Sequence, residues 1–301
     1  MTQRRTSEVR LGDLKDAYDR NGYIFPIRVM PPDEMTQVRR FLEGYLDTSK
    51  RNTKDDPLLQ CKVHMVFPWA DRLIRNPAVL DAVEALIGPN ILVWNTAVLI
   101  KKPQKQDFVS WHQDVLYWGN HPDHVVGAWI AIADSMPDNG CVRVIPGSHK
   151  WGLLPHVDTF GADNMLSRGQ QIVQPIDDAQ AVDLVLQPGE MSLHHTGTVH
   201  GSHPNRSNRF RMGFVITYMV PATTMIGPRT GATLVRGSDT HGHFDLEDTR
   251  PTIDLDPVGL VAHRKAMAPF SAAIYEGAKG KARLSIDQTR DESKTSSDPT
   301  H

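Results

Sequence analysis

The sequence predicts a mainly-β protein whose β region is preceded and followed by α-helices. Short β-rich runs separated by turn residues fill the middle of the chain, and no long helices alternate with them. The runs are residues 91–100, 109–116, 125–134, 141–145, 182–186, 191–195 and 210–219. This many short strands favours a sandwich, jelly roll or barrel over a doubly wound sheet.

The residues before position 90 predict three helices and one short strand. Residues 11–47 predict a helix that ends near Gly22, a brief strand at 23–25 and a second helix whose first turn carries proline and acidic residues. Residues 48–57 are polar and predict a loop. Asn76 and Pro77 predict the start of a third helix, which ends at Gly88. We expect these helices to cover the outside of the β core.

Three later segments complete the predicted architecture. Residues 147–180 are polar with few strand signals, which predicts a mobile lid or binding loop. Residues 257–278 predict one more helix, and the polar residues 281–301 predict a disordered tail. We therefore expect a single domain over residues 1–280.

The composition limits the partners and the compartment. The 301 residues carry a formal net charge of −2, and 40 % of them are hydrophobic. No basic stripe predicts nucleic-acid or anionic-membrane binding, and no apolar run is long enough to span a bilayer. The polar start predicts no signal peptide, and Cys61 and Cys141 are the only cysteines. We expect a cytoplasmic protein with a small-molecule substrate, and the oligomeric state is left open.

A first candidate metal motif lies in the predicted strand 109–116. His112 and Asp114 are two positions apart, so their side chains would point to the same face of a strand while Gln113 points away. An imidazole and a carboxylate are two thirds of the 2-His-1-carboxylate triad of non-haem Fe(II) oxygenases. Alone, such a triplet is also compatible with an ordinary half-buried strand.

The second histidine of a triad must come from residues 189–205, where four candidates compete. They are His194, His195, His200 and His203. His200 is favoured because Gly-Ser follows it directly and a strand containing an arginine begins shortly afterwards. A satisfied core imidazole or a surface position is the alternative for each.

Arg211 is the candidate anchor for an anionic co-substrate. It lies at the start of an otherwise apolar run, and a cation there is costly unless it pairs with an anion. A bidentate bond from guanidinium to carboxylate would satisfy it, and the distal carboxylate of 2-oxoglutarate could supply that carboxylate. Arg209 is a rival for this role, and a partly exposed strand arginine is the alternative.

Taken together, these motifs resemble the phytanoyl-CoA dioxygenase family of Fe(II)- and 2-oxoglutarate-dependent enzymes, in its bacterial small-molecule hydroxylase branch. The resemblance rests on motifs in one order: His-Gln-Asp at 112–114, Trp129, Asn139-Gly140-Cys141, Pro146-Gly147-Ser148-His149, and His200-Gly201-Ser202 with Asn205, Ser207 and Arg211. It covers about residues 10–220. The resemblance implies a double-stranded β-helix core of the jelly-roll or cupin-like type.

The resemblance also implies the site residues. His112, Asp114 and His200 would bind Fe(II), and Arg211 would anchor 2-oxoglutarate. Two further residues, Trp129 and Ser202, match family positions near the co-substrate. Related halogenases carry a small residue where Asp114 stands, so its carboxylate favours hydroxylation of an unactivated C–H bond. That reaction consumes 2-oxoglutarate and O2 and releases succinate and CO2.

Two other classes and the substrate stay open. A Zn²⁺ hydrolase also uses two histidines and a carboxylate, and a non-catalytic β-barrel binding protein needs no metal. The hydrolase would not need Arg211 as a co-substrate anchor, and loss of any triad residue would have favoured the binding protein. Several residues could face the substrate, although core packing is the more common role for such aromatics: Trp69, Asn95, Trp111, Tyr117, Trp118 and His121.

Overall fold

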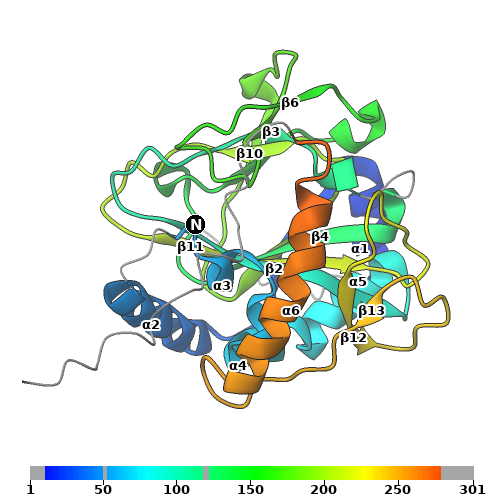
Figure 1. The fold of residues 1–301 in the computed structure, drawn as a ribbon. Helices are drawn as coiled ribbons and strands as arrows, with labels where there is room; N and C mark the ends of the chain where they lie inside the picture. Colours follow the sequence, from blue (N-terminus) through cyan, green and yellow to red (C-terminus); the bar gives the residue numbers. More distant parts are fainter. Residues whose placement is uncertain (1–10, 50–52, 118–121, 279–301) are drawn as a thin grey trace, which may run out of the picture.

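Two stacked β-sheets form the centre of the protein in a computed structural model that describes residues 11–49, 53–117 and 122–278. The large sheet has the order β1-β9-β4-β11-β2-β12-β13, and the small sheet has the order β3-β10-β5-β8. A hairpin of β6 and β7 lies beside the small sheet, above the large one in Figure 1.

The strands are β1 (Tyr23–Arg28), β2 (Ile91–Lys101), β3 (Val109–His112), β4 (Val125–Ala131), β5 (Val142–Val144), β6 (His156–Asp158), β7 (Gln170–Ile172), β8 (Val182–Leu184), β9 (Glu190–His195), β10 (His200–Ser202), β11 (Arg211–Met219), β12 (Gly231–Arg236) and β13 (Asp245–Leu246). The helices are α1 (Leu11–Asn21), α2 (Pro32–Ser49), α3 (Pro57–Gln60), α4 (Pro68–Ile74), α5 (Pro77–Ile87) and α6 (Pro257–Ile274). All pairings are antiparallel except that of β12 with β13. The predicted mainly-β fold with flanking helices is therefore confirmed.

Side-chain alternation divides the large sheet into two faces. On β11, Phe214 and Ile216 belong to the core formed with the helices before residue 90. Trp129 on β4 and Val215, its partner on β11, face the other way and pack against strands of the small sheet. The inner face of the large sheet is therefore the one on which residues can meet β3 and β10.

The helices lie where the sequence predicts them, with two additions. Apolar residues of α1, α2 and α5 pack on the outer face of the large sheet, and α6 covers one end of it through Phe270 and Met267. Short helices α3 and α4 lie between α2 and α5, and both begin with a proline in the first turn. None of the helices in the described ranges is long and apolar enough to cross a membrane.

Two local predictions are wrong. The strand that was expected to include Asp114 ends at His112, and a 3-10 helix over Asp114–Tyr117 follows it. The chain turns there because the backbone N–H groups of Asp114 and Val115 both donate to the Thr196 carbonyl, at 2.8 and 3.1 Å. Residues 147–180 contain the β6–β7 hairpin rather than being without strands. The predicted tail 281–301 lies outside the described residues, and the single-domain boundary stays a prediction.

Candidate metal and co-substrate site

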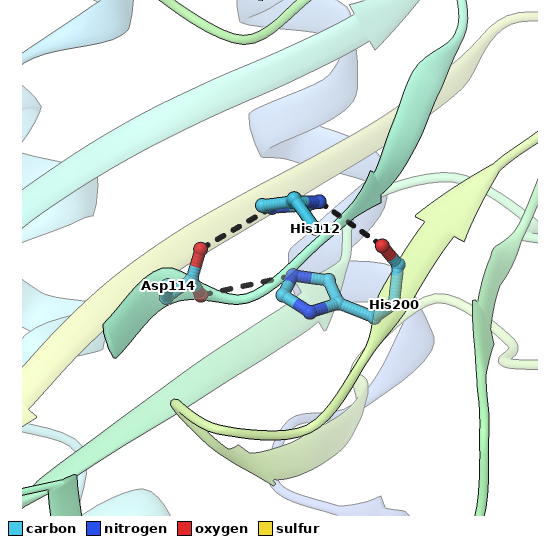
Figure 2. Close-up of side chains that lie close together, drawn as sticks. All are labelled: His112, Asp114 and His200. Atoms are coloured by element: carbon cyan, nitrogen blue, oxygen red, sulfur yellow. Dashed lines mark hydrogen bonds and ion pairs between the residues drawn. The ribbon is translucent and has the colours of Figure 1, made fainter. Parts of the chain in front are cut away.

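Three potential metal ligands converge between the sheets: His112, Asp114 and His200. Their ligand atoms all lie within 4.8 Å of one another. His112 and His200 are directly opposite in the antiparallel pair β3–β10, and their ring centroids are 4.1 Å apart. Figure 2 shows both imidazoles and the carboxylate facing one another, with Asp114 3.2 Å from His112 Nε2 and 3.7 Å from His200 Nε2. This arrangement comes from strand pairing and a 3-10 turn.

Backbone carbonyls orient the two imidazoles. His112 Nδ1 lies 2.9 Å from the Ser110 carbonyl and 3.0 Å from the His200 carbonyl, and His200 Nδ1 lies 2.9 Å from the Thr198 carbonyl. A carbonyl can only accept, so each Nδ1 carries the proton and each Nε2 keeps a free lone pair. This is the outer-shell arrangement found for histidines that bind metals. The donor set therefore fits a metal ion that is bound by two histidines and one carboxylate.

The charges of the triad also suit a divalent cation. Burial and the neighbouring His112 lower the pKa of His200 to about 3, against the opposing effect of Asp114. Burial would raise the pKa of Asp114, but His200, His112 and His194 together hold it well below its ordinary value. At neutral pH the site thus offers a neutral His200 imidazole and an ionised Asp114 carboxylate.

Gln113 points away from the metal site, as expected, and holds the neighbouring segment. Its side-chain amide donates to the carbonyls of Gly152 (2.9 Å) and Gly197 (2.7 Å), and its side-chain oxygen accepts from the Leu154 N–H. The base of segment 147–180 is therefore attached to the turn that carries Asp114. Whether this segment moves as a lid stays a prediction.

A cavity of about 150 Å³ adjoins the three candidate ligands. This volume matches a small organic molecule of about the size of benzene. Its lining combines the polar residues His112, Asp114, His194, Ser202 and Arg211 with apolar walls. The residues of the walls are Leu99, Val109, Trp129, Val142, Leu166 and Val215.

Arg211 lies at the cavity and is 1 % exposed. Its Nε donates to the Gly140 carbonyl (3.2 Å) and its Nη1 to the Leu99 carbonyl (3.4 Å), but no carboxylate pairs with it among the residues that the structure describes. Burial lowers its pKa to about 10, so it remains charged at neutral pH. A buried cation without a counter-ion is a ready site for an anion.

Trp129 and Ser202 lie at the same cavity. The Arg211 guanidinium lies 5.5 Å from the Trp129 ring centroid, and Trp129 Nε1 is buried without a hydrogen-bond partner in the described part of the chain. The indole rests on Gly213, where a Cβ atom would come within 1.9 Å of the ring. Both predicted co-substrate residues thus lie together with Arg211, although their roles stay predictions.

Sequence reasoning missed two residues of this site, Lys101 and His194. Lys101 is fully buried and its Nζ lies 2.5 Å from Ser202 Oγ. His194 lines the cavity, and its Nε2 lies 3.6 Å from Asp114. Strand alternation was the signal available for both residues, because side chains two positions apart point to the same face. Lys101 shares a face with Leu99 on β2, and His194 shares one with Ser192 on β9.

The competing histidines and arginine have other partners. His195 Nε2 lies 2.9 Å from Asp123, and His203 lies in contact with Arg143 outside the cavity. Arg209 is 47 % exposed and its Nη2 bonds Asp138 at 2.9 Å. It is therefore not the buried arginine without an anionic partner that the co-substrate role requires. Asn205 orders the loop before β11 by donating to the carbonyls of Lys101 and Arg209.

The other residues considered for substrate contact do not line this cavity. Trp69 is buried against Phe67 and Phe214, and the Asn95 side chain accepts from the Lys62 N–H. Trp111 lies under the Arg143 guanidinium, 5.7 Å from its ring centroid. The Tyr117 side chain and residues 118–121, with Trp118 and His121, lie outside the described part of the structure.

Comparison with known proteins agrees with this geometry. A probable alpha-ketoglutarate-dependent hypophosphite dioxygenase of Stutzerimonas stutzeri is 30 % identical over 157 residues, which cover 52 % of this chain and 54 % of that protein. Human peroxisomal phytanoyl-CoA dioxygenase is 34 % identical over 147 residues, covering 46 % of this chain and 43 % of that enzyme. The chain thus spans about half the length of the curated relatives it matches.

Solved structures extend the likeness over most of the chain. A structure described as non-heme monooxygenase ThoJ in its apo form is 32 % identical, with a TM-score of 0.78, and covers 92 % of this chain and 100 % of its own. CytC3 with Fe(II) and alpha-ketoglutarate is 22 % identical with a TM-score of 0.58, covering 79 % of this chain and 93 % of its own, and shows the fold alone.

The sequence pattern of one protein family matches more than half of the chain. Phytanoyl-CoA dioxygenase (PhyH) matches residues 18–213, a range that includes all three candidate metal ligands and Arg211. At the level of the family, this confirms the enzyme class and the cofactors that the motifs predicted, a dioxygenase with iron and 2-oxoglutarate. The chain belongs to the phytanoyl-CoA dioxygenase family.

Proposed function

We propose that this protein is an Fe(II)- and 2-oxoglutarate-dependent oxygenase that hydroxylates a C–H bond of a small molecule. The observation that carries the proposal is one cavity lined by His112, Asp114 and His200 together with Arg211, a buried cation that has no carboxylate partner among the described residues. One equivalent each of 2-oxoglutarate and O2 would convert substrate C–H into C–OH, with succinate and CO2 as co-products.

The chain's own residues would hold and orient the reactants. His112, Asp114 and His200 would hold the iron through two imidazole nitrogens and one carboxylate oxygen. Arg211 would bind the distal carboxylate of 2-oxoglutarate, aided by the Ser202 hydroxyl and the unpartnered Trp129 N–H. Bound iron supplies the oxygen activation that side chains cannot. The apolar walls, including Leu166 from segment 147–180, would exclude water.

Two features argue against the alternative classes. A Zn²⁺ hydrolase or a metal-free binding protein would leave the buried Arg211 cation without a purpose and without a counter-ion. The Asp114 carboxylate occupies the position that a halide would need, which supports hydroxylation over halogenation. The substrate itself is not assigned, because the relatives named above act on chemically unrelated compounds.

Succinate formation tests this proposal. Purified protein loaded with Fe(II) should convert 2-oxoglutarate to succinate in the presence of O2, and a member of a metabolite library should accelerate that conversion and gain one oxygen atom. Zn²⁺ in place of Fe(II) should give no succinate, and His200→Ala should give none with either metal. Hydrolysis of a library compound by the Zn²⁺-loaded protein, without 2-oxoglutarate, would instead show that the protein is a hydrolase.

A further inference from the structure

Lys101 places a second buried basic side chain beside Arg211. It is the last residue of β2 and is the register partner of Arg211 on β11. It is 0 % exposed, and no carboxylate forms an ion pair with it among the described residues. Lysine is almost never fully buried unless it is paired, so this position calls for an explanation.

Three oxygen atoms surround the amine. Nζ lies 2.5 Å from Ser202 Oγ and 3.5 Å from the Gly140 carbonyl, and it also contacts the His203 carbonyl. An ammonium group has three donors and no acceptor, so these three oxygens can accept from all of its N–H groups once the amine is charged. Gly140 is required here, because a Cβ atom would lie 3.0 Å from Nζ and 2.2 Å from the His203 carbonyl oxygen.

This arrangement determines what the Ser202 hydroxyl can do. When the amine is charged, the Ser202 oxygen accepts a hydrogen bond from Lys101, which leaves the hydroxyl proton free to donate elsewhere. Ser202 lines the cavity together with Arg211. The Gly140 carbonyl also accepts from Arg211 Nε at 3.2 Å, so one carbonyl connects the two cationic side chains. A charged Lys101 would therefore leave the Ser202 proton available to a carboxylate that binds at Arg211.

The charge of the amine is sensitive to an anion in the cavity. Burial and Arg211 lower the pKa of Lys101 to about 5, whereas Cys141 and Asp107 act in the opposite direction. His203, after β10, is a further titratable group beside it, and Lys101 contributes to lowering the pKa of His203. In the free protein the amine is therefore mostly neutral at pH 7, and a carboxylate bound nearby would favour its protonation.

We propose that Lys101 is a positioning residue that makes the cavity selective for a dicarboxylate co-substrate, by orienting Ser202 and gaining a proton when the distal carboxylate binds. The inference rests on the proposed function, because it takes 2-oxoglutarate as the ligand. It adds a second cation to the Arg211 site and predicts that one proton moves from solvent to the amine on binding.

Calorimetry on anaerobic Fe(II)-loaded protein tests the selectivity. Two ligands are titrated: 2-oxoglutarate, and 2-oxopentanoate, which has the same chain length but lacks the distal carboxylate. Lys101→Met should weaken 2-oxoglutarate binding by about 10- to 100-fold and change 2-oxopentanoate binding by less than about 2-fold. Lys102→Met, at the half-buried next position, is the matched control and should leave both ligands unaffected.

Different failures have different meanings. Equal losses for both ligands in Lys101→Met would show a general structural defect and overturn the inference, as would an unchanged affinity for 2-oxoglutarate. A wild-type protein that does not bind 2-oxoglutarate at all would overturn the proposed function as well.

Proton uptake provides a second measurement on the wild-type protein, which does not depend on the variant folding. Binding heats measured at pH 7 in two buffers of different ionisation enthalpy should show about one proton taken up per 2-oxoglutarate, and none for 2-oxopentanoate. Affinity for 2-oxoglutarate should accordingly fall as pH rises. No difference in proton uptake between the two ligands would overturn the inference.

Discussion

Replacement of Arg211 by methionine should remove the co-substrate site while preserving the metal site. The guanidinium is 1 % exposed and has no carboxylate partner in the part of the chain that the structure describes, so a bound carboxylate would form a fully desolvated ion pair with it. Loss of one partner of a buried pair costs about 3–5 kcal/mol. At about 1.4 kcal/mol per tenfold change, the dissociation constant of 2-oxoglutarate should rise about 100- to 4,000-fold.

Arg209→Met is the matched control for that experiment. Arg209 is two residues away but is 47 % exposed and bonds the exposed Asp138, so its loss should cost about 1 kcal/mol or less. Anaerobic calorimetry gives the two dissociation constants, and metal analysis gives the iron content, which should stay the same in both variants. A large loss of affinity in Arg209→Met with little change in Arg211→Met would refute the assignment of the anchor.

Three further perturbations test the packing, the pH dependence and the type of oxidation. Gly213→Ala should push Trp129 out of place and lower the free energy of unfolding by about 1–3 kcal/mol in denaturant titrations, whereas Gly44→Ala in α2, where a Cβ meets nothing within 4 Å, should not destabilise. Burial holds the pKa of His64 well below 6.5, so the unfolded chain binds a proton that the folded state excludes, and stability should fall by about 1.4 kcal/mol per unit as pH drops below about 6.5. His64→Gln should show a shallower dependence, and an identical slope would contradict this account. Wild-type turnover in saturating chloride should yield no chlorinated product by mass spectrometry, since a chlorinated product would mean that Asp114 does not occupy an iron position.

The sequence predicts the fold class because alternation and turn residues are local signals. The β-rich runs near residues 91–100, 125–134 and 210–219 correspond to the three central strands of the large sheet. The hairpin β6–β7 was not predicted, because its strands have only three residues each and their sequences, His-Val-Asp and Gln-Gln-Ile, carry little apolar alternation. The formation of such short strands depends on their structural context more than on their own sequence.

The candidate site was partly predictable for a similar reason. His112, Asp114, His200 and Arg211 belong to motifs whose chemistry is visible in the residue types themselves. The turn that brings Asp114 into place depends on the Thr196 carbonyl, which is 82 positions away, and no local pattern reveals it. Alternation along β2 places Lys101 on the same face as Leu99, but the oxygen atoms around its amine belong to Gly140, Ser202 and His203, which only the tertiary structure brings to β2.

Metal-dependent binding of 2-oxoglutarate tests the central claim most directly. Under anaerobic conditions, Fe(II)-loaded protein should bind one 2-oxoglutarate per chain, with a visible charge-transfer band that requires both the metal and the keto acid. His112→Ala, Asp114→Ala and His200→Ala should each lose the metal and the band. A band that persists in all three variants, or 2-oxoglutarate binding that is equally tight without metal, would contradict the assignment of this triad as the iron site.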